Sequence, residues 1–444
     1  MRAKYVVVGT GGRSWMYTHA LISDFKDVAE LTAFCDSNQA RMDFNNKLIQ
    51  QCGHPAVPTY RAHEFDRMIA EQKPDKVIVT SMDRTHHRYI CRAMELGCDA
   101  ITEKPMTVDA EKCQQIVDTV KRTGRGLTVT FNYRYSPRNT KVKEVLKSGM
   151  VGDILSVHFE WLLDTSHGAD YFRRWHRDKR NSGGLLVHKA THHFDLMNWW
   201  LDSTPELVFC LGDLRFYGKE NAERRGVTDF YSRARGSAVA AKDPYALKVS
   251  DKDERLRGLY YDAEKEDGYF RDQSVFGDGI SIEDTMGVMV RYRNKAVMTY
   301  SLNAHCPWEG YRACFNGTRG RLEFNVVETS YVSGAHEDFN MPGMRELEGR
   351  RDAMVPQILF QPHWGKAQVI EYDQKDVGGH GGGDVRLLND ILRGVQDNSL
   401  GHAAGYLDGA KSILTGIAAN ESIKTGLPVR VSSLVDLPEL FARR

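Results

Sequence analysis

The chain has 444 residues, enough for two domains that each bury a core, so a small disulfide-stapled scaffold is excluded. Its 60 Lys and Arg residues nearly balance 59 Asp and Glu residues, which excludes a global attraction to nucleic acid or to an anionic membrane. No apolar run could span a bilayer, the N-terminus lacks the apolar core of a signal peptide, and the eight scattered cysteines form no CxxC pair. We therefore expect a cytoplasmic protein with reduced thiols.

The first 125 or so residues predict a dinucleotide-binding domain of class α/β. Short runs rich in β-branched residues alternate there with amphipathic segments of helical period. Because strands that alternate with helices form parallel βαβ units, we expect a Rossmann domain with a doubly wound parallel sheet over residues 1–125. The runs are YVVVG (5–9), ELTAFCD (30–36), KVIVTS (76–81), DAITE (99–103) and LTVTF (127–131).

Residues 126–444 predict a second domain of class α+β, which would bind the substrate. Longer runs with period-2 alternation indicate an open-faced, mostly antiparallel sheet, with one face buried and the other toward solvent or a partner subunit. A segment from about 218 to 280, dense in charged residues and glycine, is expected to be an insertion, to which we assign no role. Gly426 is expected to end the last long helix.

A glycine-rich turn follows the first predicted strand in the segment VVVGTGGRS. Gly9, Gly11 and Gly12 permit a tight turn and a close approach to a pyrophosphate, and the helix start offers free N–H groups to the anion. Ser14 replaces the third glycine of GxGxxG and is small enough for the helix to pack on the strand. Many strand-to-helix turns carry two glycines, so this motif indicates dinucleotide binding only together with its context.

Asp36 ends the second predicted strand, where an acidic residue can accept hydrogen bonds from the adenosine ribose. A carboxylate there would repel a 2′-phosphate, which favours NAD over NADP. Arg41, one turn further on, would soften that preference. The alternative interpretation is that Asp36 only caps the next helix.

Glu103-Lys104-Pro105 stands at the end of another predicted parallel strand, where doubly wound sheets bind their ligands. Partial desolvation and a neighbouring cation would lower the pKa of Lys104, so that it could exchange a proton with a hydroxyl as hydride moves. Glu103 could hold the lysine or a cofactor ribose. The commoner interpretation of an isolated Glu-Lys pair is a solvated surface ion pair.

The segment GGLLVHKATHHFDLMNWW carries three histidines. A helical period places His188, His192 and Asp195 or Leu196 on one face, with His193 turned aside. The segment lacks the glutamate of HExxH and a third ligand, so we expect no metal site. Structural packing of the histidines is an alternative, but substrate contact and proton transfer are favoured because imidazole titrates near neutral pH.

With these motifs in place, the chain resembles the Gfo/Idh/MocA family of nicotinamide-dependent sugar oxidoreductases. The resemblance covers nearly the whole chain outside the insertion, and its motifs are GTGGRS, Asp36, SMDRTHHRYICRAMELGCDAITEKP, FNYRYSP, GG followed by THHFDL, and GIAANESIKTGLPV. It implies that Lys104 is catalytic, that His192 lies near the reacting carbinol, and that the open sheet mediates a homodimer or homotetramer. The cofactor-binding residues expected on this basis are Gly9, Gly11, Gly12, Arg13, Ser14, Asp36, Ser81, His86, Glu103 and Asn132.

Two positions depart from the family pattern. Where many members carry Asp four residues before the downstream histidine, this chain has His188, followed by Lys189. An imidazole and a cation in place of a carboxylate indicate an acidic or hydroxyl-rich substrate, and they add His188 to the catalytic candidates. In the loop that lines the cofactor, Ser81-Met82 replaces the common Thr-Pro.

Polar and aromatic residues near these motifs suit a carbohydrate ring, whose C–H faces stack on aromatic rings and whose hydroxyls bind Arg and His. The same residue types occur in any half-buried interface. The substrate-binding residues expected are Lys104, Arg134, Arg174, Trp175, Lys189 and His192, with Tyr135, His167, Tyr171 and His176 in the same segments.

Three functions are compatible with these features. The first is an NAD-dependent oxidoreductase that moves a hydride between nicotinamide and a ring hydroxyl of a sugar, cyclitol or sugar derivative, with Lys104, His192 and His188 handling the proton. The second is a redox-neutral NAD-dependent glycosidase that acts by transient oxidation, elimination and rehydration. The third is a non-catalytic NAD-binding sensor, against which the presence of Lys104 and His192 argues.

Overall fold

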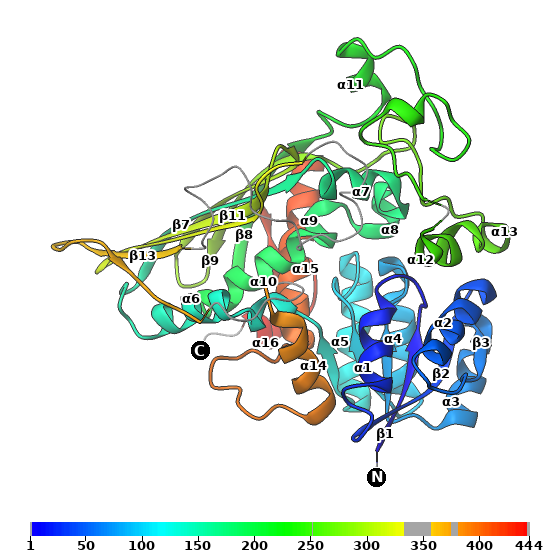
Figure 1. Ribbon diagram of the computed structural model, residues 1–444. Helices are drawn as coiled ribbons and strands as arrows, with labels where there is room; N and C mark the ends of the chain where they lie inside the picture. The colour runs from blue at the N-terminus through cyan, green and yellow to red at the C-terminus, as the bar shows by residue number, and fades with distance from the viewer. Residues whose placement is uncertain (1, 251, 333–356, 374–380, 442–444) are drawn as a thin grey trace.

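The computed structural model describes residues 2–250, 252–332, 357–373 and 381–441. Its elements gather around two sheets, one from each half of the chain. Figure 1 shows the first sheet with its helices in blue and cyan, and beside it the second sheet, whose labelled strands run from green through yellow to orange.

The first sheet has six parallel strands in the order β3-β2-β1-β4-β5-β6, which is the order of a doubly wound dinucleotide-binding domain. The predicted Rossmann fold is therefore confirmed. The strand β3 was not predicted because three residues are too few to display an alternation, and β6 carries the sheet past the expected boundary at residue 125. The strands are β1 (Ala3–Val8), β2 (Ala29–Asp36), β3 (Thr59–Arg61), β4 (Lys76–Val79), β5 (Asp99–Thr102) and β6 (Leu127–Val129). The helices are α1 (Ser14–Ile22), α2 (Gln39–Gln51), α3 (Phe65–Gln72), α4 (His86–Glu95) and α5 (Ala110–Thr123).

The second sheet has nine strands in the order β14-β13-β12-β11-β7-β10-β9-β8-β15. Neighbours run antiparallel except β7 and β10, which pair in parallel, so the expected mostly antiparallel sheet is confirmed. The strand β11 was not predicted because its glycines and asparagine are typical of turns. The strands are β7 (Ile154–Asp164), β8 (Pro205–Asp213), β9 (Thr285–Tyr292), β10 (Val297–Cys306), β11 (Glu309–Gly317), β12 (Gly320–Thr329), β13 (Gln357–Pro362), β14 (Gln368–Val369) and β15 (Val429–Arg430).

Helices cover one face of the second sheet and connect it to the first domain. The expected end of the last long helix is confirmed, since Gly426 follows α15 in the left-handed conformation with φ +70°. These helices are α6 (Pro137–Lys147), α7 (His167–Arg173), α8 (Lys179–Ser182), α9 (Leu185–His188), α10 (Ala190–Trp200), α14 (Gly383–Arg393), α15 (Tyr406–Thr425) and α16 (Pro438–Phe441). Among the described residues, none of the helices has both the length and the apolar character needed to cross a bilayer.

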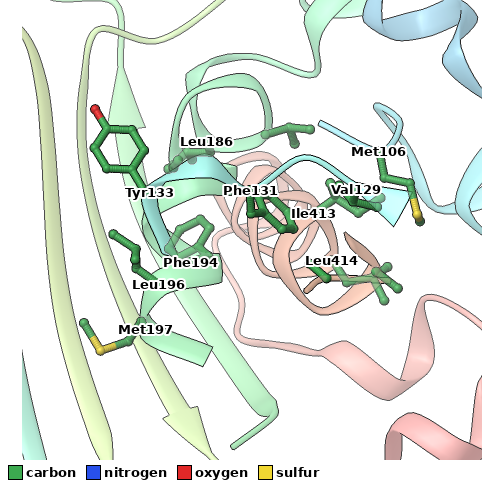
Figure 2. Packing of buried hydrophobic residues seen from close by; sticks show 14 of the residues in the cluster. Met106, Val129, Phe131, Tyr133, Leu186, Phe194, Leu196, Met197, Ile413 and Leu414 are labelled. Atoms are coloured by element: carbon green, nitrogen blue, oxygen red, sulfur yellow. The ribbon is translucent and has the colours of Figure 1, made fainter. Parts of the chain in front are cut away.

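One hydrophobic cluster joins the two domains (Figure 2). Met106 and Val129 of the first domain pack near Ile413 and Leu414 of α15, and the same cluster continues to Phe194 of α10. The domain interface is thus part of a core rather than a solvated hinge, so the two halves hold a fixed position relative to each other.

The other face of the second sheet is open and partly apolar. Leu211 and Met289, from the neighbouring strands β8 and β9, are each more than half exposed. The charged insertion leaves this sheet between β8 and β9, and it contains the short helices α11 (Lys219–Arg224), α12 (Glu254–Leu256) and α13 (Glu264–Asp267). Figure 1 shows α12 and α13 beside α2 of the first domain.

Candidate active site

The glycine turn after β1 has the shape that a dinucleotide requires. Gly9 has φ +87°, and a Cβ there would lie 2.5 Å from the backbone of Ser81. A Cβ on Gly11, by contrast, would have no atom of the described residues within 4 Å. Ser14 begins α1, and its hydroxyl donates to the Gly11 carbonyl at 2.7 Å, which fixes the turn against the helix start. The turn therefore offers open space and helix N–H groups to a pyrophosphate.

Substitutions of Gly9 and Gly11 are expected to change different properties, the stability of the fold at Gly9 and the binding of the cofactor at Gly11. We expect Gly9→Ala to lower the free energy of unfolding by at least about 2 kcal/mol, because the methyl group meets backbone at a strained φ. Gly11→Ala is the matched control, expected to keep the melting temperature and to weaken NADH binding. Thermal denaturation and NADH titration distinguish the two outcomes. Equal melting temperatures for both variants would contradict this role for Gly9.

Asp36 lies buried at the end of β2 and is held in place by its neighbours. One carboxylate oxygen accepts from the backbone N–H of Thr10 at 2.6 Å and from its hydroxyl at 3.0 Å, and the other accepts from the Asn38 N–H at 2.9 Å. The carboxylate is thus fixed between the glycine turn and the start of α2, where an adenosine ribose is expected.

Glu103 is buried and connects β5 to α1. Its carboxylate accepts from Arg13 Nε at 2.5 Å and from the Tyr17 hydroxyl at 2.7 Å. Burial raises the pKa of Glu103, but the charges of Arg13 and Lys104 outweigh burial and hold it below its ordinary value. Glu103 therefore positions the turn and the neighbouring lysine as an anion, rather than pairing on a solvated surface.

Two further residues predicted to bind the cofactor have protein contacts. His86 is buried with one ring nitrogen 2.8 Å from the Pro105 carbonyl and the other 2.9 Å from that of Ser81, so it joins the loops after β4 and β5. The Asn132 side-chain nitrogen donates to Asp384 at 2.6 Å, while its oxygen is buried without a partner in the described part of the chain.

Lys104 extends from the carboxyl end of the first sheet to the second domain. Its Nζ donates to the carbonyl of His188 at 3.2 Å. Burial lowers the pKa of Lys104 to about 8, against the carboxylates of Glu103 and Asp83, and the Lys189 charge adds to the lowering. An amine with this pKa changes protonation state within the range in which an enzyme works.

Asp83 is a member of this side-chain cluster that was not predicted. Its Oδ2 lies 2.5 Å from Nδ1 of His188, and both side chains are buried. Burial raises the pKa of Asp83 well above its ordinary value, although the charges of Lys104 and Arg174 oppose this shift. Burial and the charge of Lys104 lower the pKa of His188 well below its ordinary value. Asp83 follows the carboxyl end of β4, the same sheet edge as Lys104, and that position was the available signal.

Aromatic rings predicted near the substrate converge on His188. The ring centroids of His176, Tyr171 and Trp175 lie 4.2, 5.5 and 6.1 Å from its ring. The guanidinium of Arg174 lies 5.6 Å from the centroid of the Tyr171 ring. A basic and aromatic wall therefore stands beside the lysine, with the residue types that suit a polyhydroxylated ring.

Two family models match this chain in succession. The NAD-binding Rossmann fold of an oxidoreductase family matches residues 3–131, and the C-terminal alpha/beta domain of that family matches residues 143–431. The chain belongs to the Gfo/Idh/MocA oxidoreductase family. The predicted resemblance is confirmed, and the protein is an oxidoreductase with an NAD-binding domain.

Members of the family and related structures resemble this chain over most or part of its length. It is 34% identical to the putative oxidoreductase YteT of Bacillus subtilis, over 97% of this chain and 98% of that protein. It is 25% identical to an inositol 2-dehydrogenase/D-chiro-inositol 3-dehydrogenase of Lactiplantibacillus plantarum, over 44% of this chain and 51% of that protein. The WlbA dehydrogenase of Bordetella pertussis in complex with NADH and UDP-GlcNAcA shares the fold, with a TM-score of 0.62 at 15% identity over 97% of this chain and 99% of that chain.

The histidine segment of this Gfo/Idh/MocA protein departs from the single helical face that was expected. The helix α9 ends at His188 and α10 begins after Lys189, so His188 and His192 do not share one regular helix. The His192 ring lies 4.8 Å from that of Tyr133, and the ammonium of Lys189 lies 5.3 Å from the Trp161 ring. The catalytic role of His192 and the substrate contact of Lys189 stay predictions.

Arg134 is fully engaged inside the protein. Two of its nitrogens donate to Asp195 at 2.8 and 2.6 Å, and the guanidinium also donates to Asp408 and to the Gly401 carbonyl. Only 2% of Arg134 is exposed. The substrate contact predicted for Arg134 has no support in this position, because the FNYRY segment turns its arginine toward α10 and α15.

One group of metal-ligand types comes together among the described residues. Ligand atoms of Asp83, His176 and His188 lie within 4.8 Å of one another. The charges of Lys104 and Arg174 act on the same carboxylate, and two cations beside a site oppose a third. The absence of a metal from this Gfo/Idh/MocA site stays a prediction.

Proposed function

We propose that the protein is an NAD-dependent dehydrogenase that acts on a ring hydroxyl of a sugar, cyclitol or sugar derivative. The observation that carries this proposal is the position of Lys104, which leaves the nucleotide-binding sheet and meets His188 of the second domain at 3.2 Å. A substrate held there would have an amine with a pKa of about 8 beside its reacting hydroxyl.

When bound, NAD supplies the acceptor for the hydride that leaves the carbinol carbon. The neutral amine of Lys104 takes the hydroxyl proton as the carbon–oxygen double bond forms, and it becomes an ammonium. In the reverse direction the ammonium returns that proton. Lys104 thus moves one proton for each hydride, which keeps charge balanced at the reacting centre.

Asp83 and His188 replace the carboxylate that the family pattern places in the histidine segment. Asp83 Oδ2 lies 2.5 Å from Nδ1 of the ring, and this contact orients the imidazole. When Asp83 is ionised, its charge also favours the protonated form of Lys104, against burial. The pair would orient the substrate and tune the lysine, while the surrounding aromatic rings bind the apolar face of the sugar.

We propose NAD rather than NADP as the cofactor. Asp36 presents a fixed carboxylate at the end of β2, where it would accept from the ribose diol and repel a 2′-phosphate. We further propose a homodimer or homotetramer formed through the open sheet face, which exposes Leu211 and Met289. All eight cysteines are free, which supports a cytoplasmic location.

The test is purified protein with NAD and a panel of aldoses, glycosides, uronic acids and inositols, monitored at the absorbance band of reduced nicotinamide. A dehydrogenase accumulates NADH in proportion to oxidised product. Release of an aglycone from a glycoside without accumulation of NADH would instead establish the redox-neutral glycosidase. Binding of NAD without turnover of any member of the panel would favour the sensor.

A further inference from the structure

The charged insertion contacts the first domain at the start of α2. The Glu266 carboxylate accepts from the backbone N–H of Gln39 at 2.8 Å and from that of Ala40 at 3.0 Å. The preceding N–H, of Asn38, donates to Asp36. Three successive amides at this helix start therefore point at two carboxylates, one from β2 and one from the insertion.

The insertion also pairs with both arginines of this edge. Arg61 lies 2.9 Å from Glu266, and Arg41 lies 2.5 Å from Asp267. Arg41 further donates through Nε to the Leu259 carbonyl at 2.9 Å. An arginine beside the ribose is the residue that accommodates a 2′-phosphate in NADP-binding domains, and here both candidates are neutralised.

The contact is close and extends to the glycine turn. A Cβ on Gly258 would lie 2.2 Å from the Phe44 ring of α2, so the backbone of the insertion lies directly on that helix. Arg255 donates to the Gly12 carbonyl at 3.1 Å, and the Tyr260 hydroxyl lies 3.2 Å from where a Cβ on Gly12 would stand. The same segment thus brings a cation to the turn that receives the pyrophosphate.

These contacts decide which cofactor fits. A phosphate on the ribose 2′-oxygen would need the α2 amides and an arginine, because the amides of Gln39 and Ala40 directly follow the Asn38 amide that donates to Asp36. Glu266 and Asp267 occupy those donors and add two negative charges beside Asp36. A 2′-phosphate would find these donors already bonded and would be repelled by the carboxylates, whereas an unmodified ribose needs none of these donors.

We propose that residues 255–267 of the insertion are part of the cofactor site, and that Glu266, assisted by Asp267, selects against a 2′-phosphate. The inference rests on the proposed NAD-dependent function. The insertion would then take part in cofactor recognition. It covers the adenosine edge of the first domain, and its carboxylates neutralise the two arginines there, so that the site prefers NAD.

The test is the ratio of the dissociation constants of NADPH and NADH, measured by calorimetric titration of the full chain. We expect Glu266→Gln to lower this ratio by about tenfold, and Glu266→Gln with Asp267→Asn to lower it further, through tighter NADPH binding. Glu254→Gln is the matched control: Glu254 immediately precedes this segment, and its carboxylate is exposed and pairs with Lys47. The control is expected to keep the wild-type ratio.

Thermal denaturation checks that each variant folds. Displacement of NADH by 2′,5′-ADP measures separately the affinity for the adenosine half of the cofactor with its 2′-phosphate. An unchanged ratio in folded Glu266→Gln, or wild-type protein that binds NADPH as tightly as NADH, would overturn the inference. Both readouts are binding constants. Failure of every sugar to react would count against the proposed dehydrogenase while leaving this selection intact.

Discussion

Lys104→Met is expected to lower the rate of hydride transfer by about 10²- to 10⁴-fold, with NADH binding within about threefold of the wild type. Methionine keeps the side chain as far as Cε but lacks the amine that takes the hydroxyl proton, so only the chemical step loses its catalyst. Single-turnover absorbance with saturating NAD and sugar measures that step directly, and fluorescence titration measures NADH binding.

The matched control for Lys104 is Lys112→Met. Lys112 lies in the same domain, in the first turn of α5, and its ammonium pairs with Asp109 at the helix start rather than with a residue of the second domain. It is expected to retain wild-type turnover. Undiminished hydride transfer in Lys104→Met would refute proton transfer by this lysine, whatever its effect on sugar binding.

Arg134→Met is expected to cost about 3–5 kcal/mol of the free energy of unfolding, because it leaves Asp195 buried without its cation. Arg134 is 2% exposed and Asp195 is 1% exposed, so water cannot replace the lost partner. Arg393→Met is the control: its partner Asp27 lies on the surface, and a change within about 1 kcal/mol is expected. Urea denaturation measures both, and equal losses would contradict the structural role of Arg134.

The loss in Arg134→Met is expected to depend on pH. Burial raises the pKa of Asp195 to about 6 even beside Arg134, and removal of the cation raises it further. Above about pH 4, the folded variant keeps a proton on Asp195 that the unfolded chain releases. The free energy of unfolding of the variant therefore falls as pH rises from about 4 to the raised pKa of Asp195 in the folded variant. Urea midpoints of the variant that fall more steeply from pH 5 to pH 8 than those of the wild type are the expected result.

The parts of this site that follow a repeating backbone rule could be predicted from the sequence. Gly9, Asp36 and Lys104 each follow a short β-branched run, and parallel strands bring their carboxyl ends to one edge. Asp83 follows the same rule after β4 and was missed because no motif singled it out. Its partner His188 was identified by its departure from the family pattern, which is a chemical rather than a geometric signal.

Tertiary contacts decided the rest. Arg134 has the residue type of a sugar ligand, but whether it faces a cleft or α10 depends on packing that its local segment does not encode. Glu266 meets α2 across more than 220 positions of sequence. A segment dense in charged residues has the same composition whether it is solvated or docked, so only the fold reveals the contact.

The pH dependence of kcat/KM for sugar oxidation tests proton transfer by Lys104 most directly. Because the neutral amine is the active form, kcat/KM is expected to rise about tenfold per pH unit below the lysine pKa of about 8 and to level off above it, with the opposite trend for reduction. The rise is expected to disappear in the residual activity of Lys104→Met. A profile of kcat/KM that is flat from about pH 6.5 to 9.5, or one that Lys104→Met leaves unchanged, would contradict proton transfer by Lys104.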